Sequence, residues 1–162
     1  MAIRDKHDGA PSERQHVRLW LRLLSCSTII EKRLRRRFIS DFGTTLPRFD
    51  VMAMLERHAD GVTMGELSSA LLVSNGNVTA LVRQLEDDGY AVRRPGADDK
   101  RSSIVALTEE GRIYFEELAT AHHAWIGGMF AGMSGEDRDA LYQLLAVLKA
   151  SIAAEKAEGE GA

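Results

Sequence analysis

The 162-residue sequence predicts a mainly α-helical fold that contains one short β-hairpin. Apolar residues recur at helical spacing in two long segments, one before residue 43 and one after residue 111. Signals for short helices follow one another closely between these segments. Only Tyr90–Arg94 and Ser103–Leu107 are short enough, and rich enough in Val and Ile, to be paired strands around an intervening loop.

The composition is that of a soluble globular protein, with 44% hydrophobic and 28% charged residues. No run approaches the roughly 18 apolar residues that a membrane-spanning helix needs. The first residues lack the apolar core of a secretion signal, and Cys26 is the only cysteine, so no internal disulfide can form. These features predict a cytoplasmic protein without membrane contact. No glycine loop that could cradle a phosphate is present, and no cofactor is expected.

The first helix is expected over residues 13–42, after a polar and flexible segment over residues 1–12. It contains no Pro or Gly, and its apolar residues occupy more than one face. Such a helix needs neighbours on several sides, which a chain of this size can hardly supply alone. The same segment holds eight Lys or Arg against three acids. We therefore expect a homodimer that buries this helix, and a local basic surface.

Residues 45–111 carry the signals of three short helices and the hairpin. The first helix of this region stops before the turn dipeptide Asp60-Gly61. Thr63 and Glu66 have the spacing of a capping box, which begins the second helix. Ser74 can cap the third helix. The apolar face of this third helix comprises Val78, Leu81, Val82 and Leu85.

Two long helices are expected after the hairpin. Thr108 can cap the first of them, which should end in the glycine-containing segment 127–132, and Ser134 begins the last helix. The apolar stripe of the last helix comprises Leu141, Leu144, Leu145, Leu148 and Ile152. Residues 112–154 and residues 13–42 are therefore expected to form a dimerisation domain, followed by a flexible tail over residues 155–162.

Two short helices in close succession, followed by a hairpin, form a winged helix-turn-helix. An α-helix fits the major groove of B-DNA, where its N-terminal residues reach the base edges. The third short helix offers small polar groups there and an apolar opposite face. Its candidate DNA contacts are Ser74, Asn75, Asn77 and Thr79, with Arg83 further along. Lys100 and Arg101 at the hairpin tip can follow the phosphate backbone or enter the minor groove.

Helix-turn-helix spacing also occurs in proteins that do not bind DNA, and a basic hairpin is often only a solvated turn. A stronger signal is Asp99-x-Arg101 followed by Leu107-Thr108-x-x-Gly111, which resembles the wing signature of the MarR family (multiple antibiotic resistance regulators). The segments SNGNVTALVRQLEDDGY and LPRFDVMAML resemble that family's recognition helix and second helix. The resemblance covers roughly residues 15–152.

The resemblance implies a dimeric, ligand-responsive transcription factor that binds a palindromic operator, and not an enzyme. It favours a repressor that its effector releases from DNA. It also implies that Arg101 enters the minor groove and that Asp99 orients the guanidinium group, because a carboxylate partner fixes an otherwise mobile side chain. The pair Arg83-Gln84 departs from the Asp-Arg that the family often has there, so base preference is expected to differ.

The resemblance further implies a small aromatic effector bound between the dimer helices and the winged domain. The corresponding segments offer Trp20, Leu24, Phe38, Phe42 and Met52 as walls, and each of these could equally be a core residue. The run Lys32-Arg33-x-Arg35-Arg36-Arg37 could steer DNA or, with Arg36, bind a multiply anionic effector. The stretch SCSTIIEKRLRRRF is similar to regulators of aromatic-acid breakdown that respond to aryl-coenzyme A thioesters.

Two other functions remain open. Cys26 is expected to be a packed thiol, but a redox sensor of the same fold is an alternative. The reactive cysteine of peroxide-sensing members falls at Trp20 here, which disfavours it. A helical partner-binding protein would explain the long apolar helices but not the Asp99-x-Arg101 pattern. No metal site is expected, because the adjacent His122 and His123 point about 100° apart on a helix.

Overall fold

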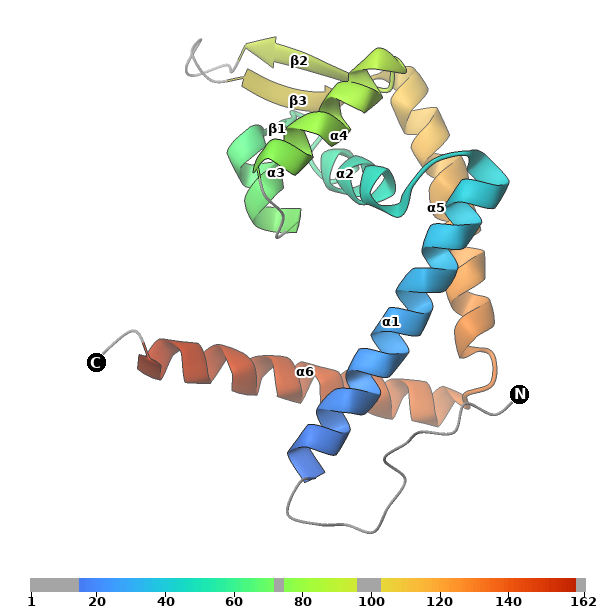
Figure 1. The fold of residues 1–162 in the computed structure, drawn as a ribbon, viewed down its shortest axis with the longest axis vertical. Helices are drawn as coiled ribbons and strands as arrows, with labels where there is room; N and C mark the ends of the chain where they lie inside the picture. Colours follow the sequence, from blue (N-terminus) through green and yellow to red (C-terminus); the bar gives the residue numbers. More distant parts are fainter. Residues whose placement is uncertain (1–14, 72–74, 96–102, 160–162) are drawn as a thin grey trace. The chain divides into compact units, whose positions relative to one another are not determined.

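The computed structural model describes residues 15–71, 75–95 and 103–159 and confirms a mainly α-helical fold with a small antiparallel sheet (Figure 1). The chain divides into two compact units, one up to His123 and one from Ala124. The elements, in order, are α1 (Gln15–Phe42), α2 (Leu46–Glu56), β1 (Val62–Thr63), α3 (Met64–Leu71), α4 (Asn75–Asp87), β2 (Ala91–Pro95), β3 (Ser103–Leu107), α5 (Glu109–Phe130) and α6 (Gly135–Gly159).

The sheet has three antiparallel strands in the order β1-β3-β2. The predicted hairpin is confirmed, and its register runs from Ala91 opposite Leu107 to Pro95 opposite Ser103. Strand β1 was not predicted, because two residues are too short to show an alternating pattern. Gly61 precedes it with φ 89°, and a Cβ there would lie 2.8 Å from the carbonyl oxygen of Val105. Glycine therefore allows the close approach of β1 to β3.

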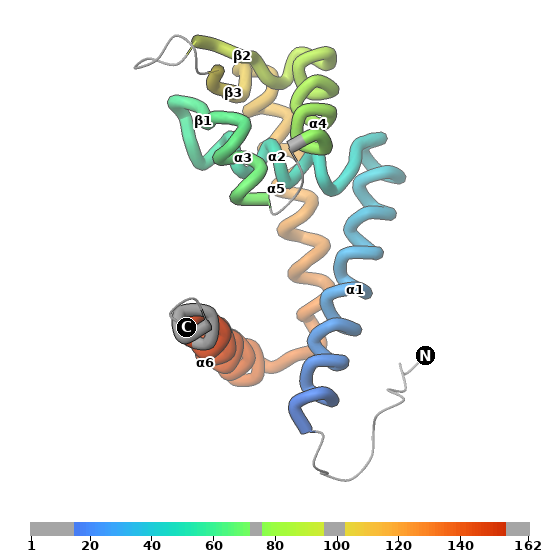
Figure 2. The backbone as a smooth tube through the Cα atoms, turned by 60° about the vertical axis from the view of Figure 1, so that its left-hand side comes forward, coloured from blue at the N-terminus to red at the C-terminus, as the bar shows by residue number. Residues whose placement is uncertain are grey.

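The core of the first unit lies where α2, α3 and α4 pack together and against the sheet (Figure 2). The helical spacing that predicted the apolar face of α4 is confirmed, since all four of its residues are at most 9% exposed. Helices α1 and α5 each add a large side chain to the buried set. The largest fully buried side chains are Phe38, Met52, Leu55, Leu67, Leu85, Leu118, Val51, Val78, Val82 and Val105.

Capping side chains begin the helices where the sequence indicates them. In the capping box, the Glu66 carboxylate accepts hydrogen bonds from the backbone N–H (2.7 Å) and the hydroxyl (2.8 Å) of Thr63. The backbone N–H of Glu66 donates in return to the Thr63 hydroxyl at 3.2 Å. Ser134 caps α6 by accepting from the N–H of Asp137 at 3.0 Å. These bonds satisfy donors that a helix start otherwise leaves unpaired.

The end of α5 falls within the expected segment 127–132, whereas α6 extends beyond its expected end. Helix α5 continues through Gly127 and Gly128 to Phe130, and α6 continues to Gly159 rather than ending at residue 154. A glycine inside a helix costs only about 1 kcal/mol relative to alanine, so neighbouring residues can carry the helix through it. The expected flexible N-terminus, residues 1–12, lies outside the described residues. No helix in the described ranges is both long and apolar enough to cross a membrane.

Candidate nucleic-acid interface

Helix α4 separates a buried apolar face from an exposed polar one. Val78, Val82 and Leu85 are fully buried, whereas the side chains of Asn77 and Thr79 are exposed. Asn75 is the first residue of α4, and Ser74 lies outside the described residues. Apolar contacts therefore hold the helix to the domain while small polar groups of its first turns face solvent.

The charges along α4 give it a direction. Its first turn contains no acid, and Arg83 is exposed midway, while Glu86, Asp87 and Asp88 stand at its C-terminal end. The N-terminal end of a helix carries partial positive charge and favours an anion, whereas acids at the C-terminal end are disfavoured there and repel phosphate. The N-terminal half of α4 is thus the half suited to approach DNA.

Strand β2 supplies two exposed arginines beside α4. The Arg93 guanidinium Nε lies 3.1 Å from Oε1 of Glu86 on α4, and Arg94 is exposed. The wing residues Asp99, Lys100 and Arg101 fall outside the described residues. Neither β2 arginine was predicted from the sequence as a candidate DNA contact. Their position directly before the basic hairpin loop is the signal that could have indicated them.

The base of the hairpin is fixed to the start of α5. The carbonyl oxygen of Tyr90 accepts a hydrogen bond from the N–H of Thr108 at 3.1 Å, and the Thr108 hydroxyl donates to the carbonyl of Gly89 at 2.7 Å. The N–H of Gly111 donates to the same hydroxyl at 3.0 Å. A Cβ on Gly111 would lie 2.0 Å from the Tyr90 carbonyl oxygen. The Leu-Thr-x-x-Gly pattern therefore holds the hairpin against α5.

Comparison with known proteins decides the family. Residues 42–102 match the sequence model of the MarR family. The transcriptional activatory protein BadR of Rhodopseudomonas palustris is 33% identical over 135 residues, which cover 81% of this chain and 77% of BadR. The chain belongs to the MarR family. It is accordingly a DNA-binding transcriptional regulator and not an enzyme.

Solved structures of MarR-family proteins share the fold. A MarR family transcriptional regulator from Silicibacter pomeroyi is 35% identical, with a TM-score of 0.69 over 87% of this chain and 99% of that chain. FabT of Streptococcus pneumoniae, solved in complex with DNA, matches with a TM-score of 0.71 at 21% identity over 85% of this chain and 97% of that chain. The latter likeness is one of fold.

The residues expected to line a MarR-family effector site do not all come together in one protomer. Phe38 and Met52 are fully buried, and the Phe38 ring lies 4.9 Å from that of Phe49, so both are core residues. Trp20 and Leu24 are exposed on the first half of α1. At 1.5 Å per residue, Trp20 and Phe38 lie about 27 Å apart along α1, so one small molecule cannot touch both within a protomer.

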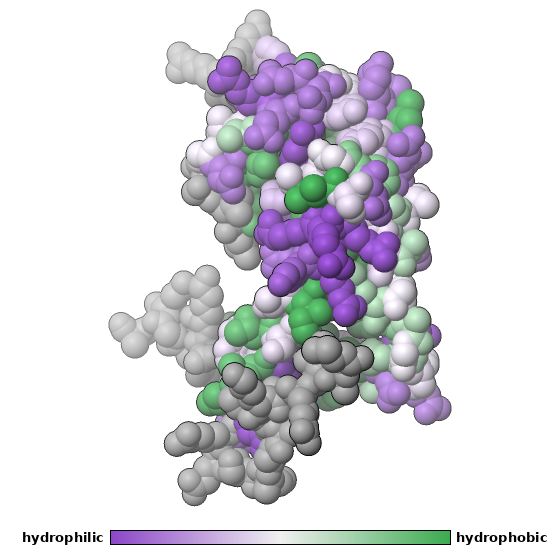
Figure 3. Space-filling view, turned by 45° about the vertical axis from the view of Figure 1, so that its right-hand side comes forward, coloured by the Kyte–Doolittle hydropathy of each residue, from purple (hydrophilic) through white to green (hydrophobic). Residues whose placement is uncertain are grey.

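The expected basic surface is present on α1. The side chains of Lys32, Arg33, Arg35, Arg36 and Arg37 are all exposed. Figure 3 shows hydrophilic side chains gathered over this part of α1. Arg35 is held by Glu31, whose Oε1 accepts from its Nε at 2.9 Å and from its Nη2 at 2.5 Å. Phe42, at the end of α1, is half-buried.

Cys26 is exposed, whereas His122 is partly buried. The prediction of a packed Cys26 is wrong for the single protomer, because the thiol is exposed on the half of α1 that has no buried residue. His122 packs on Phe49 with ring centroids 4.8 Å apart, and burial, followed by the charge of His123, lowers the pKa of its imidazole. Among the described residues, no group of three His, Cys, Asp or Glu could hold a metal ion.

Proposed function

We propose that this MarR-family protein binds a pseudo-palindromic operator as a homodimer and that a small effector releases it. Each α4 would enter a major groove, with the hairpin tip beside it at the minor groove. The observation that carries the proposal is the division of α4, which exposes Asn77 and Thr79 while it buries Val78 and Val82. An exposed polar face on a rigidly held helix is what base recognition needs.

The contacts proposed to specify and position DNA fall into two groups. Hydrogen-bonding side chains at the N-terminal half of α4, together with Arg83, would read base edges or bind phosphates. In the wing, Lys100 would bind phosphate and Arg101 would enter the minor groove, with Asp99 orienting its guanidinium group. The first group comprises Ser74, Asn75, Asn77, Thr79 and Arg83. The family resemblance of the Asp99-x-Arg101 pattern supports the second group.

Exposed apolar side chains on both long end helices support the dimer. On α1, Trp20 is 58% exposed and Leu19 is 54% exposed. On α6, Leu144 and Val147 are 66% and 68% exposed. Apolar groups at this density on two helices indicate surfaces that a second copy covers. We therefore assign dimerisation to residues 13–42 and 112–154.

The proposed effector is an aromatic acid or its coenzyme A thioester. Phe42 offers an aromatic contact near the end of α1, and Arg36 with its basic neighbours offers cations for phosphate groups. Trp20 and Leu24 lie too far along α1 to touch the same molecule within a protomer, so they would contribute from the second copy. Such a ligand acts by favouring a dimer geometry that does not fit the operator. A thermal-shift screen of aromatic acids and their coenzyme A esters tests this, because a tight ligand raises the melting temperature by mass action.

The direction of regulation needs its own test. The resemblance favours repression, whereas the relative BadR is named a transcriptional activatory protein. In a reporter strain that carries the operator upstream of its promoter, repression predicts lower expression with the protein than without it, and recovery on adding the effector. Higher expression with the protein present would make it an activator.

Operator binding is tested most simply on α4 itself. Asn77→Ala removes one neutral base-reading group, so we expect about a ten-fold loss of affinity or more, with an unchanged salt dependence. Thr120→Ala, an exposed polar change on α5, is the control and should bind like the parent. Parent-like binding by Asn77→Ala would remove α4 from the interface. Operator binding that survives peroxide treatment would also exclude Cys26 as a redox switch.

A further inference from the structure

We infer that Arg48 and Asp88 form a positioning contact that sets the angle of α4, and so controls operator affinity without touching DNA. The inference rests on the proposed operator binding through α4. Its residues belong to the first compact unit but not to the exposed face of α4. The Arg48–Asp88 contact would therefore affect DNA binding only through the orientation of α4.

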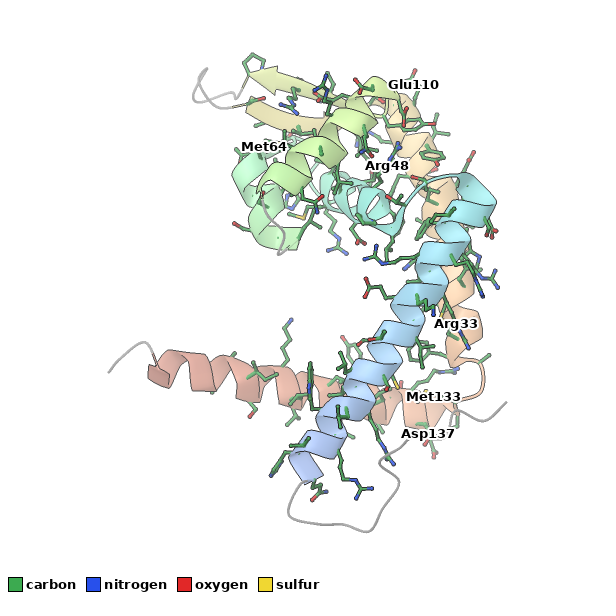
Figure 4. The ribbon with its side chains drawn as sticks, in the orientation of Figure 1. Arg33, Arg48, Met64, Glu110, Met133 and Asp137 are labelled. Carbon is green, nitrogen blue, oxygen red and sulfur yellow. The ribbon has the colours of Figure 1, made fainter. Side chains whose placement is uncertain are left out.

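The contact joins α2 to the end of the recognition helix. Nη2 of Arg48 donates to Oδ2 of Asp88, the residue directly after α4. The backbone N–H of Asp88 donates to the carbonyl of Gln84 at 3.1 Å, so Asp88 continues the last turn of the helix. Figure 4 labels Arg48 among the side chains between α2 and α4. The Arg48 side chain is only 15% exposed, whereas that of Asp88 is 46% exposed.

Other elements close around the same point. The ring of Tyr90, which precedes β2, stacks on that of Tyr114 from α5 with centroids 4.4 Å apart. Burial raises the pKa of the Tyr114 hydroxyl, and Arg48 and Asp88 are among the charged groups near it. Helices α2 and α5, the end of α4 and the start of β2 therefore meet at the Arg48–Asp88 pair.

The placement of acids makes sense if the pair fixes geometry. Acids at the C-terminal end of a helix are disfavoured by its dipole, yet α4 ends in Glu86 and Asp87, and Asp88 follows directly. Two of the three are paired, Asp88 with Arg48 and Glu86 with Arg93. Exposed pairs add little stability, but a mostly buried guanidinium that loses its partner is left poorly compensated. We therefore expect the two pairs to restrict the orientation of α4 and to add little to the free energy of unfolding.

A small change at this end of α4 becomes a large one at the other. From Asn75 to Asp87 the helix is about 18 Å long, so a tilt of about 5° at its C-terminal end would move its first turn by roughly 1.5 Å. Hydrogen bonds to base edges tolerate only about 0.5 Å in donor–acceptor distance. The side chains at the start of α4 would then lose their alignment with the groove.

The experiment compares Asp88→Ala with Asp87→Ala, which deletes the same charge from the neighbouring exposed acid and leaves the Arg48–Asp88 pair in place. Asp88→Ala deletes a negative charge, so electrostatics alone predicts tighter DNA binding. The positioning role predicts the reverse: operator affinity falls about five- to twenty-fold. Affinity for random DNA should not fall, and Asp87→Ala, which follows electrostatics alone, should bind the operator at least as tightly as the parent.

Three further readouts separate the explanations. Arg48→Gln should leave the salt slope of operator binding unchanged, whereas a direct phosphate contact by Arg48 would flatten it by about one unit. The double variant Arg48→Asp with Asp88→Arg, which restores an ion pair, should bind the operator more tightly than either single variant. Amide hydrogen exchange along residues 75–87 should rise in Asp88→Ala but not in Asp87→Ala. If Arg48→Gln does not fold, the half-exposed Asp88 still carries the test.

The outcomes are distinguishable. A parent protein that shows no sequence preference overturns the proposed function. Amide hydrogen exchange in Asp88→Ala then decides by itself whether the contact positions α4. A parent that binds its operator while Asp88→Ala binds equally or more tightly overturns the inference alone. A flattened salt slope in Arg48→Gln, or unchanged amide exchange in Asp88→Ala, also overturns it.

Discussion

At the scale of single residues, the close approach of Gly111 to the Tyr90 carbonyl explains why glycine follows Thr108 at this spacing. The pattern Thr108-x-x-Gly111 identifies a helix cap, but nothing in it indicates that Gly111 faces the carbonyl of Tyr90, which is distant in sequence. Burial on α4 was predictable, because helical spacing alone places Val78 and Leu85 on one face. The roles of Phe38 and Met52 were not predictable, because the wall of a ligand site and a core position both require apolar side chains.

Gly111→Ala should be among the most damaging small substitutions in the chain. Its Cβ would lie 2.0 Å from the Tyr90 carbonyl oxygen, and backbone atoms on both sides would have to move. We expect a loss of about 2–4 kcal/mol in the free energy of unfolding, measured by denaturant titration. Gly65→Ala, with only an ordinary contact at 3.9 Å, should be neutral or slightly stabilising. Equal stability of both variants would contradict the close contact.

His122 makes stability depend on pH in a stated direction. Burial lowers the pKa of its imidazole below the ordinary value of 6.5, so the unfolded chain binds the proton more readily than the folded one. Stability should therefore be lost as the pH falls below 6.5. His122→Gln cannot titrate, so the parent should lose stability relative to this variant between pH 7.5 and pH 5.5, measured by urea unfolding. Parallel pH profiles would show that His122 is not involved.

At the scale of elements, local signals predicted helix starts better than helix ends. Capping side chains act within three residues of each other, as in Thr63 and Glu66, so spacing alone reveals them. The end of α6 was predicted at residue 154, because the polar residues that follow add no apolar signal, although their Glu, Lys and Ala favour a helix that runs to Gly159. Strand β1 exists only through its pairing with β3, which depends on residues more than forty positions away.

The capping box of α3 gives a prediction at this scale. Thr63→Ala removes the hydroxyl that accepts from the N–H of Glu66, and we expect the free energy of unfolding to fall by about 1 kcal/mol. Thr120→Ala, an exposed change inside α5, should be neutral or slightly stabilising because alanine favours the helix interior. Thermal unfolding of both variants provides the comparison. An equal effect at the two positions would show that the box does not stabilise α3.

At the scale of the whole molecule, the sequence predicted a second copy of the chain from apolar residues that one protomer cannot bury. Leu144→Arg places a charge in the exposed apolar stripe of α6, so the proposed dimer should dissociate at micromolar concentration in sedimentation velocity. Gln143→Arg adds the same charge at a neighbouring exposed position and should leave the dimer intact. Circular dichroism should show helical signals equal to the parent in both. A Leu144→Arg protein that stays dimeric would take α6 out of the interface.

The central claim is that two recognition helices, related by two-fold symmetry, bind one duplex. Selection from a random-sequence duplex library, followed by footprinting of the enriched site, tests it most directly. We predict an inverted repeat whose half-site centres lie about one helical turn, near 10 bp, apart, with symmetric protection of both halves. Enrichment of a site without two-fold symmetry, or no enrichment over random DNA, would contradict the claim.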